Sequence, residues 1–185
     1  MTFISLLRGI NVSGQKKILM ADLKALYESL GFGNVKTYIQ SGNVIFETDS
    51  DSGDALAKKI ENKIKEVYQF EVPVLNLTQN EISKALNENP FLQESDIVQE
   101  RLYVSFLSEL PHSVHVEKID ASLYLPDRFI VKDKFIFLSI SPNGYGNTKL
   151  SNNFFESKLK VKATTRNWKT IQQLGVMSYE FFALT

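Results

Sequence analysis

One order of strands and helices occurs twice along the chain, and it limits the folds that this sequence can adopt. In the first half, the predicted strands are residues 2–8, 35–41, 44–48 and 72–77. Each is a run of apolar, β-branched or aromatic residues. Residues 20–30 and 54–68 carry apolar side chains at helical spacing and are predicted helices. The resulting order, βαββαβ, predicts helices packed on one face of an antiparallel sheet.

The pattern returns after a short predicted helix at 79–88 and a polar stretch at 93–100. The predicted strands of the second half are residues 102–107, 129–132 and 135–140, and its predicted helices are residues 112–121 and 152–159. A short extended piece near Ala163 leads to a final helix, which Asn167 is expected to cap. The second half is therefore predicted as βαββα plus a terminal helix.

These predictions describe an α+β protein of two similar ferredoxin-like, βαββαβ-type halves with helices packed on antiparallel sheets, plus a C-terminal helix. The expected division is a first half at 1–78, a helical connection at 79–100, and a second half with the terminal helix at 101–185. No sequence repeat relates the halves. We expect a two-residue hairpin turn at Gly42–Asn43, with positive φ at Gly42, and an equivalent hairpin at Asp133–Lys134.

The composition excludes several classes of protein. The 185 residues are 43% hydrophobic and 23% charged, which is typical of a soluble globular chain. No run approaches the roughly 18 apolar residues of a membrane span. There is no cysteine, so disulfides, thiolate metal sites and thiol nucleophiles are excluded. No secretory signal is visible, and we expect a cytoplasmic protein.

A net charge of zero hides an uneven distribution of charge. Residues 1–20 contain Arg8, Lys16 and Lys17 without an acid, and residues 145–170 contain six basic residues against Glu156 alone. The remainder of the chain is acidic. A mixed solvated surface would explain this layout, and so would a face that attracts anions.

Three stretches run from hydrophobic residues into small polar and basic ones. They are residues 3–14 (FISLLRGINVSG), 38–43 (YIQSGN) and 164–170 (TTRNWKT). Arg8 and Arg166 either pair with carboxylates or carbonyls inside the fold, or offer a planar fork to a phosphate or carboxylate. Trp168 is expected to pack in the core rather than to stack on a ligand.

The loop from Gly9 to Lys17 lies after a strand and before a helix, where phosphate-binding loops occur. Gln15 occupies the position of the essential lysine, and no Ser or Thr follows to hold magnesium. This excludes a nucleoside-triphosphatase motif but leaves open a weaker anion nest or a plain connection. The loop from Asn143 to Lys149, with its two glycines, is open to the same two interpretations.

Evidence for catalysis or a metal is weak. His112 and His115 are spaced i, i+3, but no nearby cysteine or carboxylate completes a ligand pattern, so we expect no metal. The three stretches contain no Asp, Glu or His to serve as a general acid or base. Catalytic residues, and whether the protein is an enzyme at all, are therefore left unassigned.

Leu6–Val12, Thr37–Val44 and Thr164–Thr170 together resemble a bacterial domain-of-unknown-function family. Members of that family open with LLRGINVGG and carry TTRNW near the C-terminus, and the similarity covers nearly the whole chain. This sequence departs at Ser13, where the family usually has glycine. The resemblance implies a ferredoxin-like, duplicated α+β fold and implies no activity. By motif match, the implied ligand-binding residues are Arg8, Asn11, Lys17, Gln40, Ser41, Asn43, Tyr145, Lys149, Arg166, Asn167 and Trp168.

Our leading hypothesis from the sequence is a binding module for a phosphorylated or otherwise anionic ligand, including a nucleotide or nucleic acid. One alternative is an enzyme acting on a phosphate-containing metabolite, and another is an oligomeric interaction protein. Single-stranded RNA is a secondary option, because no strand carries clustered exposed aromatic residues. We expect no cofactor and no membrane partner. We also expect Arg8, the Asn11–Lys17 loop and the Arg166–Trp168 segment to converge on one surface.

Overall fold

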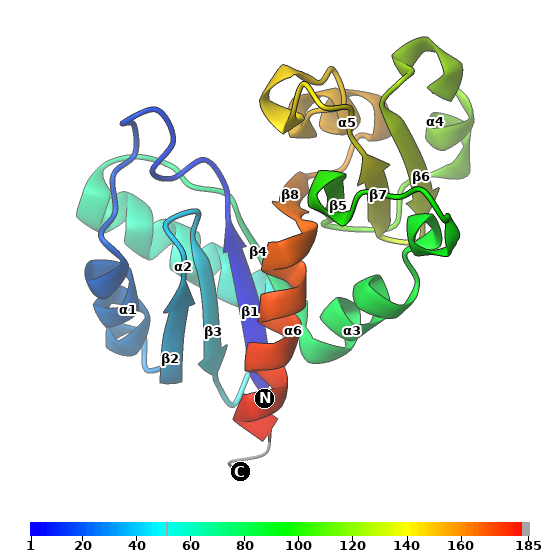
Figure 1. The fold of residues 1–185 in the computed structure, drawn as a ribbon. Helices are drawn as coiled ribbons and strands as arrows, with labels where there is room; N and C mark the ends of the chain where they lie inside the picture. Colours follow the sequence, from blue (N-terminus) through cyan, green and yellow to red (C-terminus); the bar gives the residue numbers. More distant parts are fainter. Residues whose placement is uncertain (51, 183–185) are drawn as a thin grey trace. The chain divides into compact units, whose positions relative to one another are not determined.

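The computed structural model describes residues 1–50 and 52–182, with only the backbone of residues 181 and 182. The chain divides into two compact units. The first comprises Met1–Ser83 together with the end of the chain from Leu174, and the second comprises Lys84–Gln173. Helix α6 (Trp168–Phe182), the orange-to-red helix of Figure 1, therefore contributes residues to both units. The expected boundaries assigned this whole helix to the second half.

The first unit has the βαββαβ order that the sequence predicts. Its elements are β1 (Thr2–Leu7), α1 (Met20–Ser29), β2 (Gly33–Tyr38), β3 (Asn43–Glu47), α2 (Gly53–Tyr68) and β4 (Val74–Thr78), followed by α3 (Gln79–Asn87). The strands form an antiparallel sheet in the order β2-β3-β1-β4. In this order β3 and β1 are the interior strands. Helix α1 lies in the connection from β1 to β2, and helix α2 lies in the connection from β3 to β4.

Helices α1 and α2 cover one face of this sheet because their apolar stripes match its buried positions. Leu23, Leu26 and Tyr27 of α1 and Leu56, Ile60 and Ile64 of α2 belong to one core cluster with strand residues such as Phe46. The rings of Tyr27 and Phe32 pack against Phe46, with centroids 5.3 and 4.5 Å away. Alternate residues Ile4 and Leu6 of β1 are fully buried as well, so both faces of this strand are apolar.

The second unit repeats the same architecture. Its main elements are β5 (Leu102–Leu107), α4 (Ser113–Glu117), β6 (Arg128–Lys132), β7 (Phe135–Ser139), α5 (Asn152–Leu159) and β8 (Ala163–Asn167). Short 3₁₀ segments are η1 (Pro90–Gln93), η2 (Gln99–Arg101), η3 (Ala121–Tyr124) and η4 (Tyr145–Asn147). The antiparallel sheet has the order β6-β7-β5-β8, which corresponds strand by strand to the first. Phe155 and Leu159 of α5 pack on Leu107, Ile136 and Leu138.

Two details of the sequence prediction are corrected. The extended piece near Ala163 is the full strand β8, which pairs with β5 from Leu107↔Ala163 to Tyr103↔Asn167, so the second half is also βαββαβ. The turn between β2 and β3 is the four-residue loop Ile39–Gly42 rather than Gly42–Asn43, although Gly42 has the expected positive φ of 81°. The hairpins β2–β3 and β6–β7 occupy equivalent positions in their units, as predicted.

No helix in the described part of the chain is both long enough and apolar enough to cross a membrane.

Candidate functional site

The side-chain amide of Asn11 joins two of the three polar stretches in the first unit. Its Nδ2 donates to the carbonyl oxygens of Ile18 and Gln40, both at 2.9 Å, and its Oδ1 accepts from the Ile18 backbone N–H at 2.9 Å. The loop after β1 is thereby tied to the β2–β3 loop, and Figure 1 shows both loops at the same end of the first sheet. Residues 8–19 and 39–42 therefore form one surface, which we call the loop surface.

The outer part of the loop after β1 is a small, internally bonded hairpin. Val12 and Gln15 form a β-bridge, and the Asn11 N–H donates to the Lys16 carbonyl at 3.2 Å. Ser13 and Gly14, at its tip, have φ values of 50° and 75°. Two successive positive φ values are typical of a tight type I′ turn, which favours Asn and Gly. The tip is thus built by backbone geometry that Ser13 tolerates less well than glycine would.

The β2–β3 loop is packed tightly against β1. Gly42 accepts from the Leu7 N–H at 2.8 Å, and a Cβ at Gly42 would come within 2.6 Å of the Ile10 side chain. Asn43 donates from its amide to the Tyr38 carbonyl at 2.9 Å and to the Ser41 hydroxyl at 3.2 Å. Gly42 and Asn43 therefore hold the loop in shape.

Ile39 in the same loop has a φ of 49°. A left-handed backbone is rare for a β-branched residue, and such positions cost on the order of 1–3 kcal/mol. The loop keeps this strained residue with 45% of its surface exposed. Strained positions of this kind persist only where the surrounding structure fixes them, and they cluster at functional sites.

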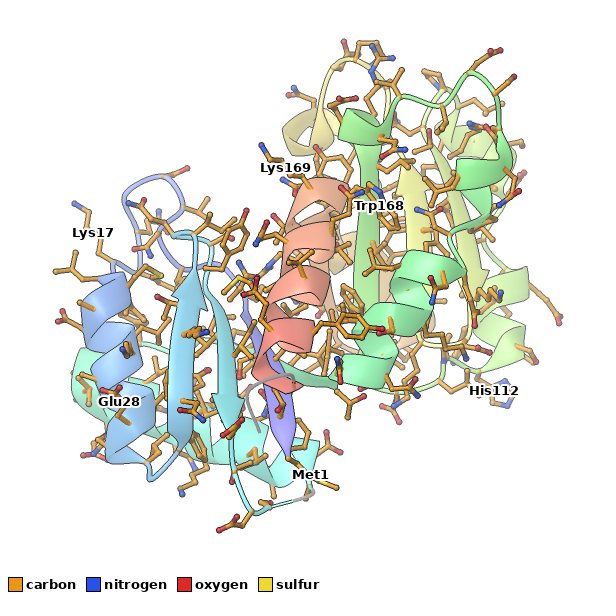
Figure 2. The ribbon with its side chains drawn as sticks, turned by 60° about the horizontal axis from the view of Figure 1, so that its bottom comes forward. Met1, Lys17, Glu28, His112, Trp168 and Lys169 are labelled. Atoms are coloured by element: carbon orange, nitrogen blue, oxygen red, sulfur yellow. The ribbon has the colours of Figure 1, made fainter. Side chains whose placement is uncertain are left out.

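The polar and charged side chains of the loop surface differ in exposure. Lys17 and Gln40 are exposed, and Arg8 and Ser41 are half-buried. Lys16 donates from Nζ to the Glu71 carbonyl at 2.6 Å, while the Glu71 carboxylate pairs with Lys65 at 2.7 Å. In the described structure, Lys17 has no hydrogen-bond or ion-pair partner. Figure 2 shows it beside the start of α1.

The second unit contains a cluster of hydroxyl groups at the start of α5. The Thr165 hydroxyl donates to Asn152 Oδ1 at 2.6 Å, accepts from Tyr145 at 3.0 Å and lies 2.5 Å from the Ser105 hydroxyl. The Tyr145 ring stacks on Tyr103, with centroids 4.8 Å apart. The cluster fixes η4 and the loop around it onto the sheet. It contains no group that could accept a proton at neutral pH.

A single carboxylate holds the loop between β7 and α5. Asp127, which is 9% exposed, accepts from the Ser141 N–H at 2.7 Å and from the Thr148 hydroxyl at 2.5 Å. Burial alone would raise the pKa of Asp127, but these hydrogen bonds outweigh it and hold the pKa below its ordinary value. An enzyme's general base needs the opposite shift. Asp127 is therefore a structural clamp.

The third polar stretch lies on β8 and the start of α6. The Arg166 side chain is buried and donates to the Thr165 carbonyl at 3.0 Å, and burial lowers the pKa of Arg166 to about 10 while Tyr145 opposes that shift. Asn167 caps α6 by accepting from the Thr170 N–H at 2.8 Å. Trp168 is 3% exposed, next to Lys169 at the start of α6 (Figure 2).

Lys149 and the two histidines complete the set of residues singled out in the sequence. Lys149 is exposed in the loop before α5. His112 accepts from the Val114 N–H at 3.3 Å and so caps α4, and its ring lies 6.1 Å from that of His115. Across the described residues, no group of three or more His, Cys, Asp or Glu side chains is placed to hold a metal ion.

The structure thus brings the first two polar stretches together within the first unit. The third belongs to the second unit, so the convergence of Arg8 with Arg166 stays a prediction. Ser105, Asn152 and Asp127 were not expected from the sequence, and Thr165 was noted only as part of the stretch 164–170. A buried serine within the apolar run of β5 was the one available signal, because a polar residue inside a core strand needs a partner.

Fold and site define a class: α+β proteins of two βαββαβ units, with a loop surface built by the polar residues that follow β1 and β2. The matching family model identifies the particular group. It is described as a protein of unknown function, DUF1697, and it matches residues 1–137, so the chain belongs to the DUF1697 family.

A solved structure supports the same fold over the whole chain. The conserved bacterial protein SP0830 from Streptococcus pneumoniae is similar with a TM-score of 0.71 and 25% sequence identity, over 96% of this chain and 98% of that one. No curated protein matches the sequence.

Proposed function

We propose that the protein binds an anionic, phosphate-bearing ligand at the loop surface of the first unit. The observation that carries this proposal is the Asn11 amide, which ties an acid-free, basic loop to the loop that carries Gln40 and Ser41. Loops whose shape is fixed before binding lose little conformational entropy when a ligand arrives. A surface of this kind is preorganised.

The charged groups of the loop surface set the expected strength of binding. Lys17 offers an exposed ammonium group, and Arg8 follows directly after β1, where its backbone N–H donates to the Pro73 carbonyl at 2.9 Å. A hydrogen bond to a charged group contributes about 1.5–3 kcal/mol, less where salt screens it. Two such bonds correspond to a dissociation constant on the order of 1 mM. The site is therefore expected to be weak for a bare anion and strongly dependent on salt.

The experiment is a titration of inorganic phosphate followed by backbone amide NMR shifts, at low and at high salt. Amides of residues 9–18 and 39–42 are expected to shift together, with about a tenfold loss of affinity in Lys17→Ala. Lys58→Ala is the matched control, because Lys58 is an exposed lysine on α2 outside the loop surface. Circular dichroism checks that each variant is folded.

The comparison of Lys17→Ala with Lys58→Ala decides whether phosphate binds at the loop surface. If phosphate shifts no amide of the loop surface, or if Lys17→Ala and Lys58→Ala bind phosphate equally well, the proposal is wrong. Arg8→Ala adds a second measurement where the variant folds, since Arg8 is half-buried and also serves the fold. Arg166→Ala, in the second unit, tests the predicted convergence: a loss of phosphate affinity in a folded Arg166→Ala would support it.

A further inference from the structure

Three exposed aliphatic residues belong to the loop surface, which also carries Arg8, Lys16 and Lys17. Val12 is 59% exposed, Leu19 is 70% exposed and Ile39 is 45% exposed. Each is the immediate neighbour in sequence of one of the three residues that the Asn11 amide joins, which are Asn11 itself, Ile18 and Gln40. The three residues therefore lie on the two loops that the Asn11 amide ties together.

Ile39 indicates that this apolar area is not accidental. Its left-handed backbone and its exposure both disfavour isoleucine, since Asn or Gly would satisfy the same φ and a polar residue would satisfy the solvent. Single exposed aliphatic residues need no explanation. A strained one, on the same loop surface as Lys17 and two other exposed aliphatic residues, indicates a position kept for contact with a ligand.

We infer that the ligand is a soluble phosphate ester with an apolar or aromatic group, its phosphate on Lys17 and Arg8 and its apolar part on Val12, Leu19 and Ile39. This inference rests on the anion binding proposed above. A bare anion would gain nothing from the three aliphatic side chains. The apolar part of an ester would be removed from water by them, which strengthens binding in proportion to the area buried.

A membrane phospholipid shares the chemistry of a phosphate ester but fits this surface less well. Stable attachment to a bilayer needs either a large apolar insertion or a polybasic patch of several Lys and Arg residues. The loop surface carries three cations, and one of them, Lys16, is already bonded to the Glu71 carbonyl. The small size of the apolar area suits a small soluble molecule.

The test compares inorganic phosphate with adenosine monophosphate on the same protein. Wild type is expected to bind the nucleotide about tenfold more tightly than phosphate. Ile39→Asn keeps a residue that tolerates positive φ and removes the aliphatic group, so it should lower nucleotide affinity about three- to tenfold without changing phosphate affinity. Val12→Asn should act in the same direction. Leu110→Asn, at a 65% exposed leucine of the second unit, is the matched control and should change neither.

The outcomes separate this inference from the proposed function. Equal affinity for phosphate and nucleotide, or nucleotide binding that survives both substitutions, overturns the inference and leaves anion binding standing. If neither probe binds, both proposals are wrong. Sedimentation with vesicles of phosphatidylserine and phosphatidylcholine is the third arm: binding to vesicles in the absence of nucleotide binding would assign the surface to a membrane instead.

Discussion

Ser105 and Thr165 face each other across β5 and β8, with their hydroxyl oxygens 2.5 Å apart. Ser5 and Asn76 occupy the same positions across β1 and β4 of the first unit, and the Ser5 hydroxyl donates to Asn76 Oδ1 at 2.5 Å. In each unit the bond continues to the first residue of the second helix: Thr165 donates to Asn152, and Asn76 donates to the Gly53 carbonyl. The halves thus share a polar connection between sheet and helix, although they share no visible sequence repeat.

Thr165→Val is expected to destabilise the second unit by about 2–3 kcal/mol. The substitution keeps the β-branched shape and removes the hydroxyl that Ser105, Tyr145 and Asn152 share, leaving three polar groups without it. Urea unfolding followed by circular dichroism measures the change. Ser105→Ala removes one outer partner and should cost only about 1 kcal/mol. Equal losses in the two variants would show that Thr165 is not the centre of the cluster.

Ser13→Gly is expected to stabilise the protein by about 1 kcal/mol. Ser13 has a φ of 50°, and a left-handed backbone costs a residue with a Cβ about 1–2 kcal/mol, part of which glycine loses again through its greater freedom when unfolded. Thermal unfolding measures the change.

Gly14→Ala is the complementary variant. Gly14 has a φ of 75° and open space where a Cβ would lie, so a loss of about 1 kcal/mol would come from the backbone alone. For the Ser13→Gly variant described above, a loss of stability instead of a gain would contradict the type I′ assignment of this turn.

Asp127→Asn is expected to lower stability by about 1–2 kcal/mol at pH 7, because the Ser141 N–H and the Thr148 hydroxyl donate to different carboxylate oxygens and the variant amide has only one oxygen to accept them. The pKa of Asp127 is lowered in the folded protein, so its charged form stabilises the fold above the ordinary carboxyl pKa of about 3.9. That contribution is lost as the pH falls through the lower, folded pKa. Urea unfolding of both proteins from pH 7 to pH 3 should show their difference shrinking at the acid end. A difference that is constant with pH would show that the charge of Asp127 does not matter.

Asn11→Gly is expected to destabilise the first unit by about 2–3 kcal/mol. Glycine keeps the positive φ of 57° at this position, so the loss isolates the three hydrogen bonds of the amide. Hydrogen exchange of residues 9–18 and 39–42 should rise together. Gln15→Gly, at an exposed residue of the same loop, controls for the added flexibility of glycine. Exchange that rises in one loop alone would show that Asn11 does not couple them.

The sequence predicted the order of elements and the two-unit α+β fold because apolar periodicity is strong in most strands and helices. It failed at β8, where Ala-Thr-Thr-Arg-Asn has no apolar alternation. Pairing with β5 makes this segment a strand, and such a long-range contact leaves no local signal. The turn at Gly42 was shifted for a similar reason: the left-handed Ile39 that lengthens the loop contradicts local preference.

The candidate residues could be chosen from the sequence, but their roles could not. Asn11, Asn43 and Asn167 were selected as polar residues near basic ones, and the structure shows each of them bonding to backbone groups. The same amide chemistry serves a ligand or a loop, and only the partner atoms distinguish these uses. Exposed Lys17 and strained Ile39 are the residues whose placement the fold alone does not explain.

Helix α6 has a consequence for how the protein is made. The first unit includes the residues from Leu174 onward as well as Met1–Ser83, so a ribosome that has released the first unit's sheet has not yet synthesised all of that unit. An N-terminal domain usually completes its folding while the rest of the chain is still emerging. In this protein, residues 1–83 cannot complete their unit until the residues from Leu174 onward have been synthesised. Both units are therefore expected to reach their final form only after translation of α6.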